Sequence, residues 1–143
     1  ITGFNYRLTD IQATIGEIQL SRLDEQITRR RQLVDCYRAN LKDQDRFSIH
    51  TEPEGSYFNW QSLPVRFDLT KVGQGPLLEY LAKLGIMAKP GIMNAHEEPP
   101  YAGLWQLPNS ERRKLDTIFV PLFHSMTEED VARVSTALTL YQT

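Results

Sequence analysis

Two polar side chains near the start of the chain have the types and the spacing of an anion-binding site. Asn5 and Arg7 alternate with the aromatic residues Phe4 and Tyr6, just before the first predicted helix. An amide supplies neutral donors, and a guanidinium supplies a planar fork that matches phosphate. The first turn of a helix adds the positive end of its dipole. These residues therefore predict a phosphate contact, and the alternative is a polar lead-in whose aromatic rings pack on the core.

A second candidate is His96, which lies beside Glu97 and Glu98 in a long segment rich in proline and turn residues. Long ordered loops are often functional, and the alternative is an ordinary loop histidine. His50 and His124 show no metal-ligand spacing with it, so we predict no metal site. No nucleophile elbow, P-loop, dinucleotide fingerprint or zinc-protease motif occurs in the sequence.

Other conspicuous residues are interpreted as structural. Arg29–Arg31 is the densest run of charge. On a helix these side chains fan through about 200°, so we interpret them as part of a solvated helix with acidic residues nearby. Cys36 is interpreted as a small packing residue, and Trp60 and Trp105 as anchors of the core or of a loop.

A long N-terminal helix must position the first candidate site. Thr9 and Gln12 have the spacing of a capping box, which predicts a helix start. Apolar residues follow with helical spacing, but after Ile18 the stripe shifts by two residues, or about 200° of rotation. The shift predicts a bend near residues 19–25, or a helix that buries two faces in succession, and the helical pattern continues to Leu41.

The rest of the chain predicts short strands and helices. We expect strands over 47–50, 57–67, 86–92 and 118–122, and helices over 75–84, over 110–117 and after Thr127. Pro64 suggests an edge strand or a bulge. The loop over 93–109 is expected to be held by Tyr101 and Trp105. The predicted class is α+β, with a small sheet covered by helices and no doubly wound sheet.

Composition sets broad limits. The chain has 143 residues, a formal net charge of −2 and one cysteine. This balance gives no reason to expect nucleic-acid binding, and no apolar run approaches the length of a membrane span. With one cysteine and no signal-peptide pattern, we expect a reducing, cytoplasmic setting. The abrupt start at Ile1, without an initiator Met, suggests a chain cut from something longer.

Three blocks of sequence resemble one family. The segment GFNYRLTDIQATIGEIQLSRLDEQITRRR resembles the G-[YF]-N-[YF]-R-[LM]-[TS]-D-[IL]-Q-A-A-[IL]-G segment of the DegT/DnrJ/EryC1/StrS aminotransferases. KPGIMNAHEEPPYAGLW is similar to that family's proline-rich loop, and LPNSERRKLDTIFVPLFHSMTEEDVARV to its closing segment. The blocks occur in the family's order and extend from Gly3 to Val134.

The resemblance implies the C-terminal portion of a fold-type-I enzyme that uses pyridoxal 5′-phosphate. Residues 1–45 would be the connector helix with a dimer-interface segment, and residues 46–143 a small C-terminal domain with a mostly antiparallel sheet. The lysine that carries the cofactor would lie upstream, so no catalytic residue is expected here and the cofactor would be bound mainly by the absent domain. The fragment alone should be inactive.

The resemblance also implies site residues and partners. Asn5 would contact the cofactor phosphate in the partner subunit of a homodimer, and Arg7 the cofactor or the phosphates of a nucleotide sugar. His96 and Tyr101 would belong to the loop that approaches this substrate. Glu97 and Glu98 depart from the family pattern, because two carboxylates near a diphosphate repel it unless they point away.

Three functions follow from these features. The first is amino transfer from an amino acid, by family resemblance Glu or Gln, to a nucleotide-linked keto sugar for cell-surface polysaccharides or secondary metabolites. The second is a sugar dehydratase of the same fold, in which histidine replaces the cofactor lysine. The third is a non-catalytic interaction module that uses the apolar faces of the connector helix.

Overall fold

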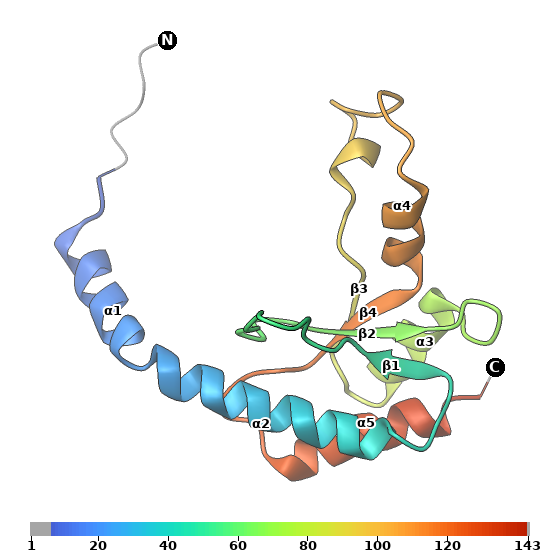
Figure 1. Ribbon diagram of the computed structural model, residues 1–143, viewed down its shortest axis with the longest axis horizontal. Coiled ribbons are helices and arrows are strands. Elements are labelled where there is room, and N and C mark those ends of the chain that lie inside the picture. The colour runs from blue at the N-terminus through green and yellow to red at the C-terminus, as the bar shows by residue number, and fades with distance from the viewer. Residues whose placement is uncertain (1–6, 143) are drawn as a thin grey trace.

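The N-terminal part of the chain forms two consecutive helices in the computed structural model, which describes residues 7–142 (Figure 1). Helix α1 spans Asp10–Ser21 and helix α2 spans Leu23–Leu41. Arg22 separates them with φ −102° and ψ 1°, so the predicted bend is confirmed. The capping box of Thr9 and Gln12 is also present. A helix with two buried faces does not form, because no residue of α1 is buried.

Four short strands form one antiparallel sheet. They are β1 (Phe47–Ile49), β2 (Leu63–Phe67), β3 (Lys89–Pro90) and β4 (Thr117–Val120). Their order in the sheet is β1-β2-β4-β3, and each neighbouring pair is antiparallel. Val65 in the middle of β2 lies opposite Ile49 of β1 and Ile118 of β4. The α+β class is therefore confirmed, with a small antiparallel sheet and covering helices.

Helices pack on one face of this sheet and bury its apolar side chains. The remaining helices are α3 (Gln74–Lys83), the 3-10 turn η1 (Ala95–Glu97), α4 (Pro108–Leu115) and α5 (Glu128–Leu140). Helices α2 and α5 lie side by side beneath the sheet (Figure 1). Side chains from both helices and both central strands are fully buried between them: Leu33, Tyr37, Val65, Ile118 and Leu138. This burial is the main favourable contribution to folding.

The other face of the sheet is only partly covered. Leu63, Val65 and Phe67 of β2 are buried in the core, whereas Pro64 and Arg66 alternate with them and are half-buried. Because directly opposed residues share a face, Phe119 lies beside Pro64 and Thr117 beside Arg66. Helix α4 rises from this face, away from α2 and α5 (Figure 1).

Two predicted strands are shorter than expected. Residues 57–62 are irregular, so the strand predicted over 57–67 begins only at Leu63, and the strand predicted over 86–92 is reduced to β3. The edge prediction for Pro64 is confirmed locally, although strand β2 as a whole has a neighbour on each side. Strand β1 ends at Ile49, opposite Val65, so at Pro64 only β4 pairs and the missing N–H is tolerated.

The structure also tests the predicted roles of the cysteine, the two tryptophans and the arginine run. Trp60 is buried and Cys36 packs against the core, as predicted. Tyr101 is 49% exposed and Trp105 57% exposed, so the prediction that these two residues anchor the loop is wrong. The solvated interpretation of the arginine run is wrong for Arg29 and Arg31, because Arg29 donates to the carbonyl oxygen of Met126 at 2.9 Å and Arg31 binds Glu52.

Within residues 7–142, none of the helices combines the length and the hydropathy that crossing a bilayer requires.

Candidate functional site

The predicted phosphate contact is only partly described. Asn5 lies outside the described residues. Arg7 is exposed in the non-helical segment that leads to the N-cap residue Thr9. Its guanidinium is therefore accessible just ahead of the α1 N-terminus.

His96 is buried and faces helix α4. Its side chain is 7% exposed, and its Nε2 lies 3.1 Å from Oε1 of Glu111. The same carboxylate oxygen accepts a hydrogen bond from the backbone N–H of Leu107 at 3.1 Å. Glu111 thus fixes the imidazole and the start of α4 together.

The structure brings His96 and Tyr101 onto one open cleft of about 450 Å³, whose lining also includes Met93, Trp105 and Ser110. The neighbouring Glu97 accepts a hydrogen bond from Nζ of Lys114 at 2.9 Å, and this contact lowers the pKa of Glu97 below its usual range. The carboxylate is therefore paired with a cation on α4, which reduces the repulsion expected toward an anionic ligand.

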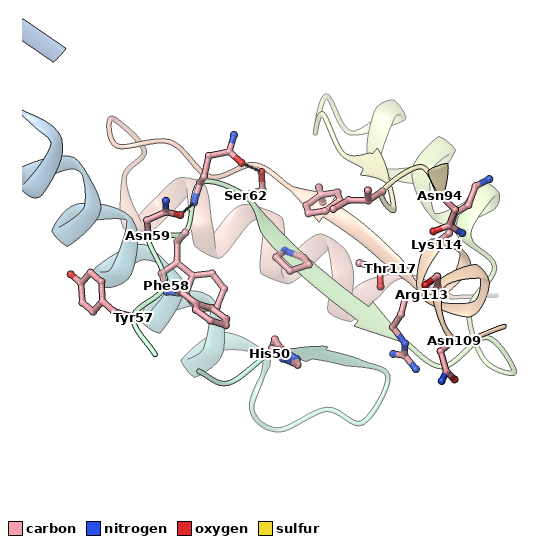
Figure 2. A pocket seen from close by; sticks show the side chains of 16 residues that line it. His50, Tyr57, Phe58, Asn59, Ser62, Asn94, Asn109, Arg113, Lys114 and Thr117 are labelled. Atoms are coloured by element: carbon pink, nitrogen blue, oxygen red, sulfur yellow. Dashed lines mark hydrogen bonds between the residues drawn. The ribbon is translucent and has the colours of Figure 1, made fainter. Parts of the chain in front are cut away.

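A larger cleft, of about 770 Å³, lies on the open face of the sheet (Figure 2). Pro64 of β2 and Thr117 and Phe119 of β4 lie along it. The irregular segment 57–62 forms one end, and the loop after β3 together with α4 forms the other. Its size is typical of small-molecule sites. Within residues 7–142, no group of three or more His, Cys, Asp or Glu side chains is arranged to hold a metal ion.

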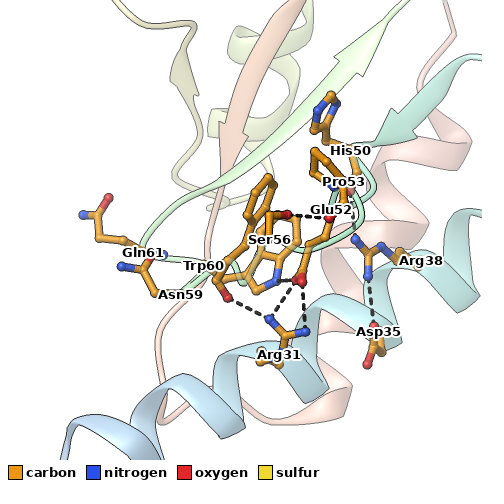
Figure 3. Close-up of polar contacts among 11 residues, drawn as sticks. Arg31, Asp35, Arg38, His50, Glu52, Pro53, Ser56, Asn59, Trp60 and Gln61 are labelled. Atoms are coloured by element: carbon orange, nitrogen blue, oxygen red, sulfur yellow. Dashed lines mark hydrogen bonds and ion pairs between the residues drawn. The ribbon is translucent and has the colours of Figure 1, made fainter.

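The segment 57–62 is held by a network that crosses from helix α2 (Figure 3). The guanidinium of Arg31 donates to both carboxylate oxygens of Glu52, at 2.7 and 3.1 Å, and to the carbonyl oxygen of Phe58 at 2.8 Å. The indole N–H of Trp60 donates to Oε1 of Glu52 at 3.0 Å. The hydrogen bonds from Arg31, and to a smaller extent from Trp60, lower the pKa of Glu52 below its usual range. The carboxylate therefore stays ionised at neutral pH.

Trp60 has an unusual backbone conformation. Its φ is 47°, and among the non-glycine residues that the structure describes only Trp60 has a positive φ. For a bulky residue this conformation costs of order 1–3 kcal/mol and persists where the surroundings enforce it. Phe58 packs edge-on against the indole at 5.2 Å, and the Arg38 guanidinium lies 5.2 Å from the ring centroid.

Sequence reasoning missed this part of the site. Neither Glu52 nor Asn59 and Gln61 was singled out, and Arg31 was interpreted as solvated. The usable signal was the aromatic run at 57–60 directly after a turn, next to polar residues that a strand facing the core would not carry.

Comparisons with known proteins agree on one family. The model of the DegT/DnrJ/EryC1/StrS aminotransferase family matches residues 1–139. Over 142 residues the chain is 32% identical to the GDP-perosamine synthase of Caulobacter vibrioides. The alignment covers 96% of this chain and 38% of that relative. The chain thus spans less than half the length of this curated relative.

Solved structures show the same fold. The crystal structure of the aminotransferase TlmJ from Streptoalloteichus hindustanus matches with a TM-score of 0.85 and 26% identity, over 96% of this chain and 38% of that one. A GDP-4-keto-6-deoxymannose-3-dehydratase matches with a TM-score of 0.81 and 20% identity, over 96% of this chain and 37% of that one. The family match extends over nearly the whole chain and includes helices α1 and α2 as well as the sheet, so the chain belongs to the DegT/DnrJ/EryC1/StrS aminotransferase family.

Proposed function

We propose that this chain is the C-terminal part of a pyridoxal-phosphate-dependent aminotransferase that transfers an amino group to a nucleotide-linked keto sugar. The observation that carries the proposal is the family match over residues 1–139, together with 32% identity to a GDP-perosamine synthase. Such an enzyme would serve sugar synthesis for cell-surface polysaccharides or secondary metabolites, in the cytoplasm.

The residues present fit a secondary contact to the cofactor. Arg7 is exposed next to a helix N-terminus, and its planar fork suits a phosphate. Asn5 is proposed as its companion. The chain has five lysines, none in the family's S-x-x-K context, so the lysine that holds the cofactor would lie outside this chain. When bound, pyridoxal phosphate supplies the carrier for the amino group between donor and acceptor.

The chain's own residues would bind and orient. Arg7 would hold a phosphate of the cofactor or of the nucleotide sugar. His96 and Tyr101 share one cleft, where the imidazole, fixed by Glu111, and the phenol would contact the sugar. The exposed apolar residues of α1 support a homodimer, because a solvated stripe of this kind is typical of an interface.

The test uses the full-length protein that carries this chain. It should show the visible absorption band of bound pyridoxal phosphate, and glutamate should abolish that band. A folded, cofactor-loaded protein that shows neither would overturn the proposal. Arg7→Ala should raise KM for the nucleotide sugar about tenfold or more, the equivalent of a charge-assisted hydrogen bond. Unchanged kinetic constants would remove Arg7 from this role.

A dehydratase of the same fold is the second candidate, because the chain superposes on a structure of that activity. The two reactions differ in mass balance, since amino transfer adds nitrogen to the sugar and dehydration removes water. Mass spectrometry of the product therefore distinguishes them. The amino acid at the position of the cofactor lysine, lysine or histidine, should agree with the result.

A further inference from the structure

The cleft on the open face of the sheet has a lining that suits an uncharged ring. Pro64, Ile92 and Phe119 provide apolar surface. The ends of the cleft carry neutral amides and hydroxyls: Asn59 and Ser62 at one end, and Asn94 and Asn109 at the other (Figure 2). Gln61, which lies between Asn59 and Ser62 in the chain, and Ser110 also line the cleft. An apolar surface with a few placed polar groups is the usual make-up of a small-molecule site.

The two cations at this cleft are already paired. Arg113 lies 3.0 Å from Oδ2 of Asp116, and Lys114 lies 2.9 Å from Oε2 of Glu97. A phosphate would have to compete with these carboxylates, although Arg66 and Arg112 also approach Asp116, at 3.6 and 3.9 Å. We therefore assign the ligand to the neutral lining of the cleft and not to its cations. The side-chain oxygen of Asn59 accepts from the backbone N–H of Gln61, and that of Gln61 accepts from the Ser62 hydroxyl. Their amide NH₂ groups remain as donors for a ligand.

The end of the cleft that carries Asn59 and Gln61 is preset by strain. Trp60 lies between these two residues with φ 47°, and Arg31 and Glu52 hold it through the indole N–H and the carbonyl of Phe58. A segment that only connected β1 to β2 would not need this conformation. Enforced strain of this kind clusters at ligand sites, because a preset wall lowers the ordering cost of binding.

We propose that this cleft binds the uncharged sugar or nucleoside part of a nucleotide sugar, and that Arg31 acts through Glu52 as a positioning residue for its wall. The inference rests on the proposed function, and it assigns to this face of the sheet a contact that adjoins the cleft of His96 and Tyr101, with which it shares Asn94 and Ser110. Sugars and nucleosides share the relevant chemistry, which is a ring with flat apolar faces and hydrogen-bonding edges.

The main experiment is calorimetric titration of the full-length, cofactor-loaded protein with GDP-mannose, GDP and mannose. Gln61→Ala and Asn109→Ala should each weaken GDP-mannose binding about fivefold to tenfold, as expected for one lost hydrogen bond. Both residues are exposed, so the fold should persist. Asn40→Ala is the matched control, because this exposed amide lies on α2 and is not part of the cleft lining.

Comparison of the three ligands distinguishes a cleft that binds the nucleoside from one that binds the sugar. If GDP binding also weakens in the variants, the cleft holds the nucleoside; if only GDP-mannose binding weakens, it holds the sugar. Variants that bind every probe as Asn40→Ala does would overturn the inference and leave the proposed function standing. Failure of the unaltered protein to bind GDP-mannose would also overturn it, and the cofactor band then tests the proposed function independently.

The positioning role of Arg31 is tested by a kinetic constant that a purely structural role would leave unchanged. Arg31→Ala should raise KM for the nucleotide sugar and leave kcat near that of the unaltered protein, because the wall is loosened but the reacting groups are untouched. Arg31→Lys should partly restore KM, since an ammonium can keep one contact to Glu52 but not the fork. A loss of thermal stability with KM unchanged would overturn the positioning role.

Discussion

Tyr37 is fully buried, and its hydroxyl donates to the carbonyl oxygen of Pro121 at 2.9 Å. Burial, with a smaller contribution from the Asp130 carboxylate, raises the pKa of Tyr37 well above its ordinary value. The unfolded chain therefore loses this proton first, as pH rises through about 10. The stability that Tyr37 contributes is present at lower pH and declines above that value.

Replacement of this tyrosine tests that pH dependence. At neutral pH, Tyr37→Phe should lower the free energy of unfolding by about 1 kcal/mol, because the Pro121 carbonyl loses its donor. Above about pH 10 the difference between the two proteins should shrink. Urea unfolding of both proteins, at neutral and alkaline pH, measures it. A difference that stays constant with pH would contradict the assignment.

The sequence indicated which side chains could form polar contacts, but it did not indicate their partners. Arg31 and Glu52 are 21 positions apart and His96 and Glu111 are 15 apart, so each pair depends on how a loop returns to a helix. No local pattern encodes that return. The positive φ of Trp60 has the same origin, because a tryptophan adopts it only when tertiary contacts enforce it.

At the scale of elements, two helices that begin with a threonine N-cap give a direct comparison. Thr127 and Thr9 each accept from a backbone N–H three residues later in a capping box, at the starts of α5 and α1. Helix α5 is packed against α2 in the core, whereas α1 buries no residue. Thr127→Ala should therefore lower the free energy of unfolding by about 1 kcal/mol, and Thr9→Ala should leave it nearly unchanged.

Urea unfolding followed by fluorescence gives the stability of the packed body, and circular dichroism gives the helix content. Thr9→Ala should show only a small loss of helix signal at the N-terminal end. Equal destabilisation by both substitutions would mean that α1 is coupled to the core.

Helix starts and ends were predictable because caps, prolines and glycines act locally. Gly85 follows α3 with φ 69°, the predicted capping box of Thr9 forms, and α5 begins after Thr127 as predicted. The strand prediction was wrong for residues 57–62, because β1 ends at Ile49, opposite Val65, and this stretch therefore has no partner in β1. The requirement for glycine at position 91 also depends on the tertiary structure, because a Cβ there would lie 2.5 Å from the carbonyl oxygen of Lys114.

At the scale of the whole molecule, the described chain consists of a packed body and a helix that projects from it (Figure 1). The apolar stripe that Leu8 begins just before α1 is solvated, with Leu8 and the α1 residues Ile11, Ile15 and Ile18 each between 54% and 75% exposed. An exposed stripe of this kind marks an interaction surface. The chain spans 38% of a curated relative, and the proposed homodimer gives this stripe a partner.

Removal of residues 1–21 separates the stability of the body from association. Because α1 buries no residue, the remaining chain should keep its free energy of unfolding within about 0.5 kcal/mol. The isolated 143-residue chain should self-associate through α1, whereas the shortened chain and the variant Ile15→Glu should be monomeric by size-exclusion mass measurement. The matched control is Ala132→Glu, an exposed position on α5, which should associate like the unaltered chain. Unfolding of the shortened chain would show that α1 stabilises the body. A 143-residue chain that stays monomeric at all concentrations would contradict self-association through α1.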